Sequence, residues 1–310
     1  MGNATDIEVK ISRTKSARKK PAVFTVINYG VLILLSVLCL LPFVNLFAVS
    51  LSSSYAVNAR LVRFIPIQIT IESYKFVITS GTFLRAFAIS VQRVVVGVLL
   101  NMFLTILVAY PLAKDKSRFL ARGFYAWYFI ITSLMSVGLI PLYMTVRFTG
   151  LLDSFLSLIL PAAVPIFNVI VLLNFFRNLP RELEESAVID GAGEWATLWR
   201  IFVPLSKPAL ATLTLYAIIF HWNSWFDGLI YMNRPENYPL QSYLRTVIMN
   251  PEMYFQLTTA DGNYEKFLAF VNFRTARSAQ IFVAALPMLL VYPFLQKYFT
   301  KGLVLGSVKG

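Results

Sequence analysis

The residues whose types and spacing are most informative lie in a polar segment between two strongly apolar runs. The segment reads Glu185-Ser186-Ala187-Val188-Ile189-Asp190-Gly191, and Ile201-Phe202-Val203-Pro204 follows ten residues later. Acidic side chains suit the first turn of a helix, and glycine suits the left-handed position just after a helix end. The spacing therefore predicts two short helices over about 178–204, with a bend at Gly191 and a stop at Pro204.

The order of these residues resembles the "EAA" loop of permease subunits in ATP-binding-cassette (ABC) importers. Ser186 stands in place of the usual Ala and Val203 in place of the usual Leu, and both replacements are small or aliphatic. In that family the loop docks onto the ATPase. The resemblance implies that seven residues couple this chain to an ATPase: Glu185, Ser186, Ala187, Asp190, Gly191, Ile201 and Pro204.

The second short helix is predicted to be amphipathic. Its apolar face consists of Trp195, Leu198, Trp199 and Phe202, spaced i, i+3, i+4, i+7. A helix of this kind can also rest on a membrane surface. That alternative explains the second helix but neither the acidic first helix nor the match to the loop, so we favour docking onto a partner.

Residues for catalysis or metal binding are missing. The chain has one histidine, His221, and one cysteine, Cys39, and its carboxylates are scattered. It contains no Gly-Lys-Ser/Thr sequence that could cradle a nucleotide phosphate. We therefore expect a non-catalytic chain with no metal and no cofactor of its own. By the same resemblance, ATP and Mg²⁺ would bind to partner ATPase subunits.

The elements that position this loop are membrane spans. Only 14% of the 310 residues are charged and 57% are hydrophobic, whereas soluble domains contain about 25% charged residues. A helix needs about 20 apolar residues to cross a bilayer. Six stretches fit: Phe24–Val49, Val94–Ala113, Gly123–Val146, Ser154–Phe176, Pro208–Phe226 and Ser278–Gln296. We expect an all-α membrane protein with six transmembrane helices.

The distribution of basic residues orients these spans. With a cytoplasmic N-terminus, seventeen Lys and Arg fall in inside segments and ten in the longer outside segments. This is the positive-inside pattern, so both termini are expected in the cytoplasm. The net charge of +13 is then explained by attraction to anionic lipid headgroups rather than by nucleic-acid binding.

The spans and loops divide the chain into four parts. Residues 1–22 are expected to be a basic cytoplasmic tail, and 23–84 the first transmembrane helix with an external loop. Residues 85–300 would form the core permease domain with five helices and the coupling loop, and 301–310 a cytoplasmic tail. The third external loop, about 233–277, is too long and too aromatic for a linker, so we expect it to pack against the rest.

The C-terminal part carries a second resemblance. Residues 295–302 and 306–310, and the sequence Trp222-Asn223-x-Trp225, are similar to maltose-type carbohydrate importers. The likeness implies a type I ABC importer permease fold and the role of second permease subunit of an oligosaccharide importer in the bacterial cytoplasmic membrane. The implied partners are a homologous permease, two cytoplasmic ATPase subunits and an extracytoplasmic sugar-binding protein.

Candidates for the sugar path are His221, Trp222, Asn223 and Trp225, because sugars need amides and flat aromatic faces. For His221 and Asn223 we favour hydrogen bonding between helices over contact with the sugar. Arg93 and Asp227 lie near the ends of their spans, so we expect both to reach the interface.

An ion-coupled secondary transporter of a small polar solute is the alternative function. That class often shows inverted repeats and buried ionisable residues at mid-membrane. The sequence indicates neither, and dependence on a cytosolic ATPase would separate the two classes.

Overall fold

The computed structural model describes residues 22–135, 138–249 and 272–307. Within these ranges the secondary structure is helical, apart from one isolated bridge between Ser52 and Ile69. Residues 1–21 of the predicted tail (1–22), about half of the third external loop (250–271) and the last three residues lie outside the described ranges.

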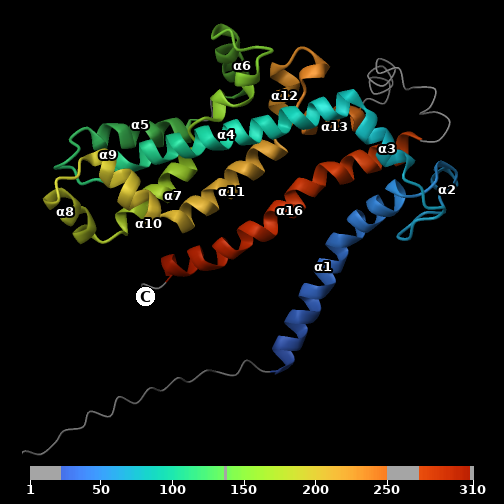
Figure 1. Ribbon diagram of the computed structural model, residues 1–310, viewed down its shortest axis with the longest axis horizontal. Coiled ribbons are helices and arrows are strands. Elements are labelled where there is room, and N and C mark those ends of the chain that lie inside the picture. Colours follow the sequence, from blue (N-terminus) through green and yellow to red (C-terminus); the bar gives the residue numbers. More distant parts are fainter. Residues whose placement is uncertain (1–21, 136–137, 250–271, 308–310) are drawn as a thin grey trace, which may run out of the picture.

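The bundle is built around α4 (Gly81–Ala113), which runs along its whole length (Figure 1). Beside it lie α7 (Ile166–Arg177) and α11 (Lys207–Asn223), and α11 in turn contacts α16 (Phe273–Ser307). The end of α1 (Ala22–Ser50) meets α16, while the rest of α1 stands away from the bundle (Figure 1).

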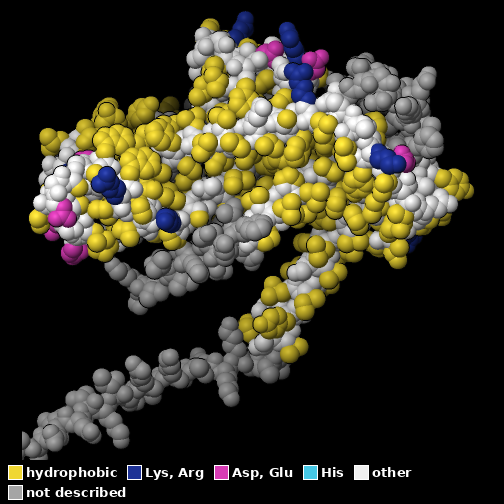
Figure 2. All heavy atoms as spheres, viewed as in Figure 1, with side chains coloured by type: hydrophobic (Ala, Val, Ile, Leu, Met, Phe, Trp, Pro, Cys, Tyr) yellow, Lys and Arg dark blue, Asp and Glu magenta, His cyan; other side chains and the backbone are white. Residues whose placement is uncertain are grey.

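The six predicted spans each fall on one helix or on a bent pair of helices. Among the described residues, α1 and α4 are each long and apolar enough to cross a bilayer. Two further spans arise when bent pairs are counted together: α5 (Arg122–Leu134) with α6 (Leu139–Phe148), and residues 155–162 with α7. A third bent pair joins residues 194–205 to α11, but the fifth predicted span falls on α11. The sixth stretch lies within α16. Figure 2 shows the result, an apolar flank between ends where charged side chains gather.

Two helices extend beyond their predicted apolar spans. The helix α4 begins at Gly81, so the second span starts well before Val94, and residue 85, where the core domain was predicted to begin, lies inside this helix. Likewise α16 continues to Ser307, through most of the tail predicted at 301–310. The predicted windows were bounded by charged residues, whereas these helices continue beyond Arg93 and Lys297.

The fourth span is broken near its middle. Two short 3₁₀ turns, η1 (Phe155–Leu158) and η2 (Leu160–Ala162), precede Pro165 and meet α7 at an angle of 47°. Proline removes a backbone donor and limits the residue before it, so it favours such a break.

Two apolar clusters hold the bundle together. The external one joins α3 (Glu72–Thr79), the first half of α4, α13 (Leu240–Met249) and α16, and includes Phe83, Tyr243 and Val247. The cytoplasmic one joins the second half of α4 to α7, α11 and the coupling loop. Because α13 belongs to the third external loop, the expectation that this loop packs against the bundle holds for its described part.

One glycine sets the distance between α4 and α11. A Cβ on Gly97 would lie 2.5 Å from Nε2 of His221, whose ring is fully buried. We expect Gly97→Ala to destabilise the folded protein by about 1–3 kcal/mol, because the buried imidazole has no room to move away. Thermal unfolding in detergent would measure this. Gly123→Ala, where no atom lies within 4 Å, is the matched control, and equal stability of the two variants would contradict the prediction.

Candidate coupling site at the cytoplasmic end

The predicted first short helix is α8 (Arg181–Ile189), with Glu182 and Glu184 in its first turn. Its end has the hydrogen bonds of a Schellman cap: Gly191 N donates to Val188 O (3.1 Å) and Ala192 N to Ala187 O (2.9 Å). Gly191 has φ +76°, a conformation that glycine adopts without a Cβ penalty. The expected bend at Gly191 is therefore present.

The predicted second helix is divided into α9 (Glu194–Thr197), a π-helical turn η3 (Leu198–Phe202) and α10 (Val203–Leu205). These elements bend by 81° from α11, so we place the fifth span in α11 alone. The predicted single apolar face is only half right. Leu198 and Phe202 are buried, but Trp195 and Trp199 are exposed, so the four residues do not form one buried face.

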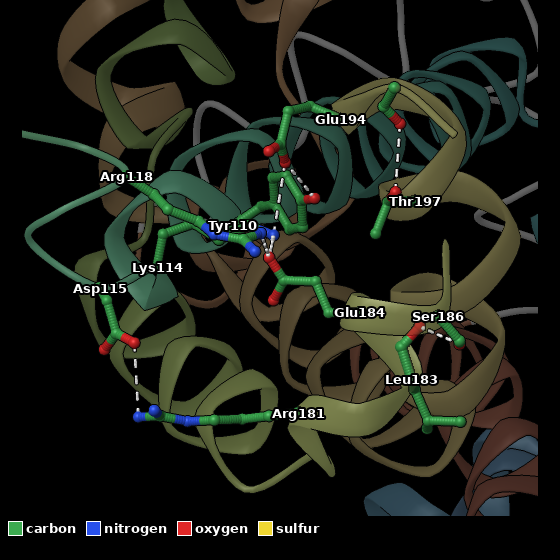
Figure 3. Close-up of polar contacts among 11 residues, drawn as sticks. Tyr110, Lys114, Asp115, Arg118, Arg181, Leu183, Glu184, Ser186, Glu194 and Thr197 are labelled. Atoms are coloured by element: carbon green, nitrogen blue, oxygen red, sulfur yellow. Dashed lines mark hydrogen bonds and ion pairs between the residues drawn. The ribbon is translucent and has the colours of Figure 1, made fainter. Parts of the chain in front are cut away.

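An ion-pair network ties this loop to the end of α4 (Figure 3). Lys114 Nζ lies 2.6 Å from Glu184 Oε1 and 3.3 Å from Glu194 Oε2. Arg118 also donates to Glu184, and the Tyr110 hydroxyl donates to Glu194 Oε2 at 2.6 Å. One buried lysine thus connects α4 to both short helices of the loop.

The lysine sits on aromatic rings. Its Nζ lies 4.2 Å from the centre of the Tyr110 ring and 4.9 Å from that of Phe202, within cation–π range. Burial alone would raise the pKa of Glu194, but the Tyr110 hydrogen bond and the Lys114 charge lower it below its ordinary 4.5. Glu194 is therefore ionised at neutral pH, and the network is complete.

The outer surface of α8 is apolar at its tip. The Ile189 side chain is 85% exposed and Val188 is 49% exposed, whereas Ala187 packs inward. Of the other predicted coupling residues, Glu185, Ser186, Asp190 and Pro204 are exposed, and Ile201 packs against the cytoplasmic cluster. The structure thus gathers the predicted residues at one end of the bundle, next to α9 and α10 (Figure 1).

Sequence reasoning missed Tyr110, Lys114, Arg118 and Glu194 as parts of this site. The available signal was charge: the 114–122 loop is basic and the 178–204 loop begins with several acidic residues. Both loops were expected on the same side of the membrane, so pairing between them could have been predicted.

Comparison with known proteins identifies the family. The family model described as the binding-protein-dependent transport system inner membrane component matches residues 32–304. The chain belongs to this family. Protein LplC of Bacillus subtilis (strain 168) is 40% identical over 96% of this chain and 97% of its own length. The polygalacturonan/rhamnogalacturonan transport system permease protein YtcP of the same organism is 36% identical over 94% and 100%.

A solved structure agrees with this assignment. The crystal structure of a bacterial ABC transporter involved in the import of the acidic polysaccharide alginate has a chain with TM-score 0.82 and 30% identity. The likeness covers 90% of this chain and 97% of that one. This chain therefore has the type I ABC permease fold and is a multi-pass, non-catalytic subunit of the bacterial cytoplasmic membrane. In such a system ATP is hydrolysed by a separate ATPase, and a partner permease and a binding protein take part.

Of the four residues predicted to line the sugar path, two are buried in contacts between helices and two are exposed. The buried His221 places Nε2 at 2.7 Å from Asn101 Oδ1 on α4, a hydrogen bond between helices. Trp222 is also buried and donates to Ala284 O of α16 at 3.2 Å. Asn223 and Trp225 are exposed.

The expectation for Arg93 and Asp227 is wrong. Arg93 is fully buried, and its guanidinium donates to both carboxylate oxygens of Asp227, to Oδ1 at 3.2 Å. The earlier start of α4 places Arg93 on the fourth turn of a long helix, facing α12 (Phe226–Tyr231). The permease therefore contains a buried ionisable pair, a feature that we expected of a secondary transporter. Membership of the binding-protein-dependent family argues against that alternative.

Proposed function

We propose that this permease forms half of the translocation path of an oligosaccharide importer. The support comes from the relatives' names, which include polygalacturonan, rhamnogalacturonan and arabinooligosaccharide transport systems, and from the alginate transporter. The proposed partners are a second, homologous permease, two ATPase subunits and an extracytoplasmic sugar-binding protein. The core that forms this half-path would be residues 85–300, extended to the start of α4.

We further propose that the 178–204 loop transmits ATP-driven motion by docking onto the ATPase. The observation that carries this proposal is the shape of α8: it is capped at Gly191 and presents Ile189 and Val188 outward. Behind this tip, the Lys114 network fixes α8 to α4, which crosses the membrane. A rigid, apolar tip on a held helix fits a groove on a partner protein.

Ile189 provides the test. We expect Ile189→Asp to weaken association with the ATPase about tenfold or more, because a charge would have to be buried in an apolar contact. The permease would be expressed with its genomic neighbours, and the amount of ATPase that co-purifies with it would be measured in detergent.

Ile65→Asp is the matched control, since Ile65 is similarly exposed (76%) but lies in the first external loop. The partner permease should co-purify with both variants. The coupling role would be refuted if the ATPase stayed bound to Ile189→Asp as firmly as to Ile65→Asp.

A further inference from the structure

A hollow lies beside the break in the fourth span. Its volume is about 400 Å³, and it is lined by residues of α4, η2, α7 and α11, among them Asn101, Pro165, Asn168, Tyr216 and Phe220. Asn101 and Tyr216 are near the middle of their helices, so the hollow is at mid-membrane depth. Its size is that of sites for small ligands, about 300–1,000 Å³.

Two asparagine side chains line this hollow, and one of them has no hydrogen-bond partner among the residues that the structure describes. Asn101 is saturated: Nδ2 donates to the carbonyls of Ala162 (2.8 Å) and Ala163 (2.9 Å), and Oδ1 faces His221. The Asn168 residue is only 6% exposed and lines the hollow, and its side-chain amide forms no hydrogen bond with any group that the structure describes. This amide can donate and accept hydrogen bonds, so it is available for a ligand in the hollow.

The N-terminus of α7 lies at the same hollow. No side chain caps this helix at Pro165, and the first N–H groups of a helix have no partner within it. These groups and the helix dipole favour an anion. No Asp or Glu lines the hollow, so nothing there would repel one.

The hollow opens on the flank of the subunit. Tyr216 and Phe220 are 41% and 50% exposed, and both line it. A free amide and an uncapped helix start are not tolerated against lipid, but are tolerated beside protein or a water-filled cavity. This flank would therefore face the path between the two permeases.

We propose that the hollow is a subsite for a sugar acid, and that it binds the carboxylate of a uronate unit. The start of α7 and the Asn168 amide would bind the carboxylate, while Tyr216 and Phe220 would pack against the sugar ring. The inference rests on the proposed function and assigns its substrate to the acidic oligosaccharides.

The test uses the complete importer with its binding protein in proteoliposomes, and two probes, trigalacturonate and the neutral arabinotriose. We expect Asn168→Asp to lower trigalacturonate uptake about tenfold through like-charge repulsion, with arabinotriose uptake and co-purification of partners unchanged. Asn174→Asp is the control: the same substitution at an exposed position six residues later on α7.

Three outcomes would overturn the subsite. They are unchanged trigalacturonate uptake in Asn168→Asp, an equal loss for both sugars, and a wild-type importer that carries arabinotriose alone. The last result would leave the importer function intact, whereas a wild-type complex that assembles but imports neither sugar would count against both proposals. If Asn168→Asp does not assemble, Asn168→Ser decides, with an expected loss of about threefold; full uptake by that variant would refute the subsite.

Discussion

Replacing Arg93 with leucine is expected to destabilise the permease by about 3–5 kcal/mol, the largest effect of any substitution considered for this chain. Arg93 is fully buried and pairs with both oxygens of Asp227, which is 24% exposed. Removing the guanidinium leaves a carboxylate without its counter-charge near the membrane interior. Thermal unfolding in detergent and the yield of folded protein from membranes would measure the loss.

A second substitution separates loss of the pair from loss of packing. In Arg93→Leu/Asp227→Asn no charge remains, and the Asn oxygen can still accept the Gly228 N–H that Asp227 now accepts at 2.9 Å. We expect the double variant to recover to within about 1 kcal/mol of wild type. Arg85→Leu breaks an exposed contact of 3.7 Å to Glu236 and should cost less than about 1 kcal/mol. If Arg93→Leu were as stable as Arg85→Leu, the pair would have no structural role.

The Arg93–Asp227 pair could not be predicted from the sequence. The spans, the short helices of the coupling loop and the conformation of Gly191 follow from local rules on apolar length, capping and glycine, and these were predicted. Arg93 and Asp227 are 134 positions apart, and no local rule pairs them. One apolar window begins just after Arg93 and another ends just before Asp227, so each residue was expected at the membrane interface. The helix α4 in fact starts twelve residues before Arg93.

The same limit applies to the two candidate sites. The spacing of Trp195, Leu198, Trp199 and Phe202 assumes one continuous α-helix. The π-turn η3 interrupts that helix after Thr197, and two of the four side chains are exposed. Pro165 favours a break in the fourth span. Proline chemistry does not reveal that Asn101 satisfies the carbonyls of Ala162 and Ala163 while the Asn168 side chain stays unbonded, because that depends on the register of α4 against α7.

Lys114→Met is expected to separate ATP hydrolysis from transport. Methionine keeps the apolar contact with Tyr110 and Phe202 but removes the charge-assisted hydrogen bond to Glu184, worth about 1.5–3 kcal/mol. It also removes the ion pair with the more exposed Glu194, worth about 0–1 kcal/mol. The tip of α8 with Ile189 is unchanged, so the ATPase should still bind. With α8 no longer fixed to α4, its movement would be passed on poorly, and we expect about tenfold less sugar imported per ATP hydrolysed.

The ratio of sugar imported to ATP hydrolysed, measured in proteoliposomes, is the readout that distinguishes this from simple loss of assembly. Arg181→Met is the matched control: it also removes a cation, on α8 itself, but its partner Asp115 is 3.4 Å away and both side chains are mostly exposed. Exposed pairs contribute about 0–1 kcal/mol, so that variant should keep the wild-type ratio. Lys114 would have no part in coupling if the two variants gave the same ratio. If instead the ATPase failed to co-purify with Lys114→Met, the network would serve docking rather than the transfer of motion to α4.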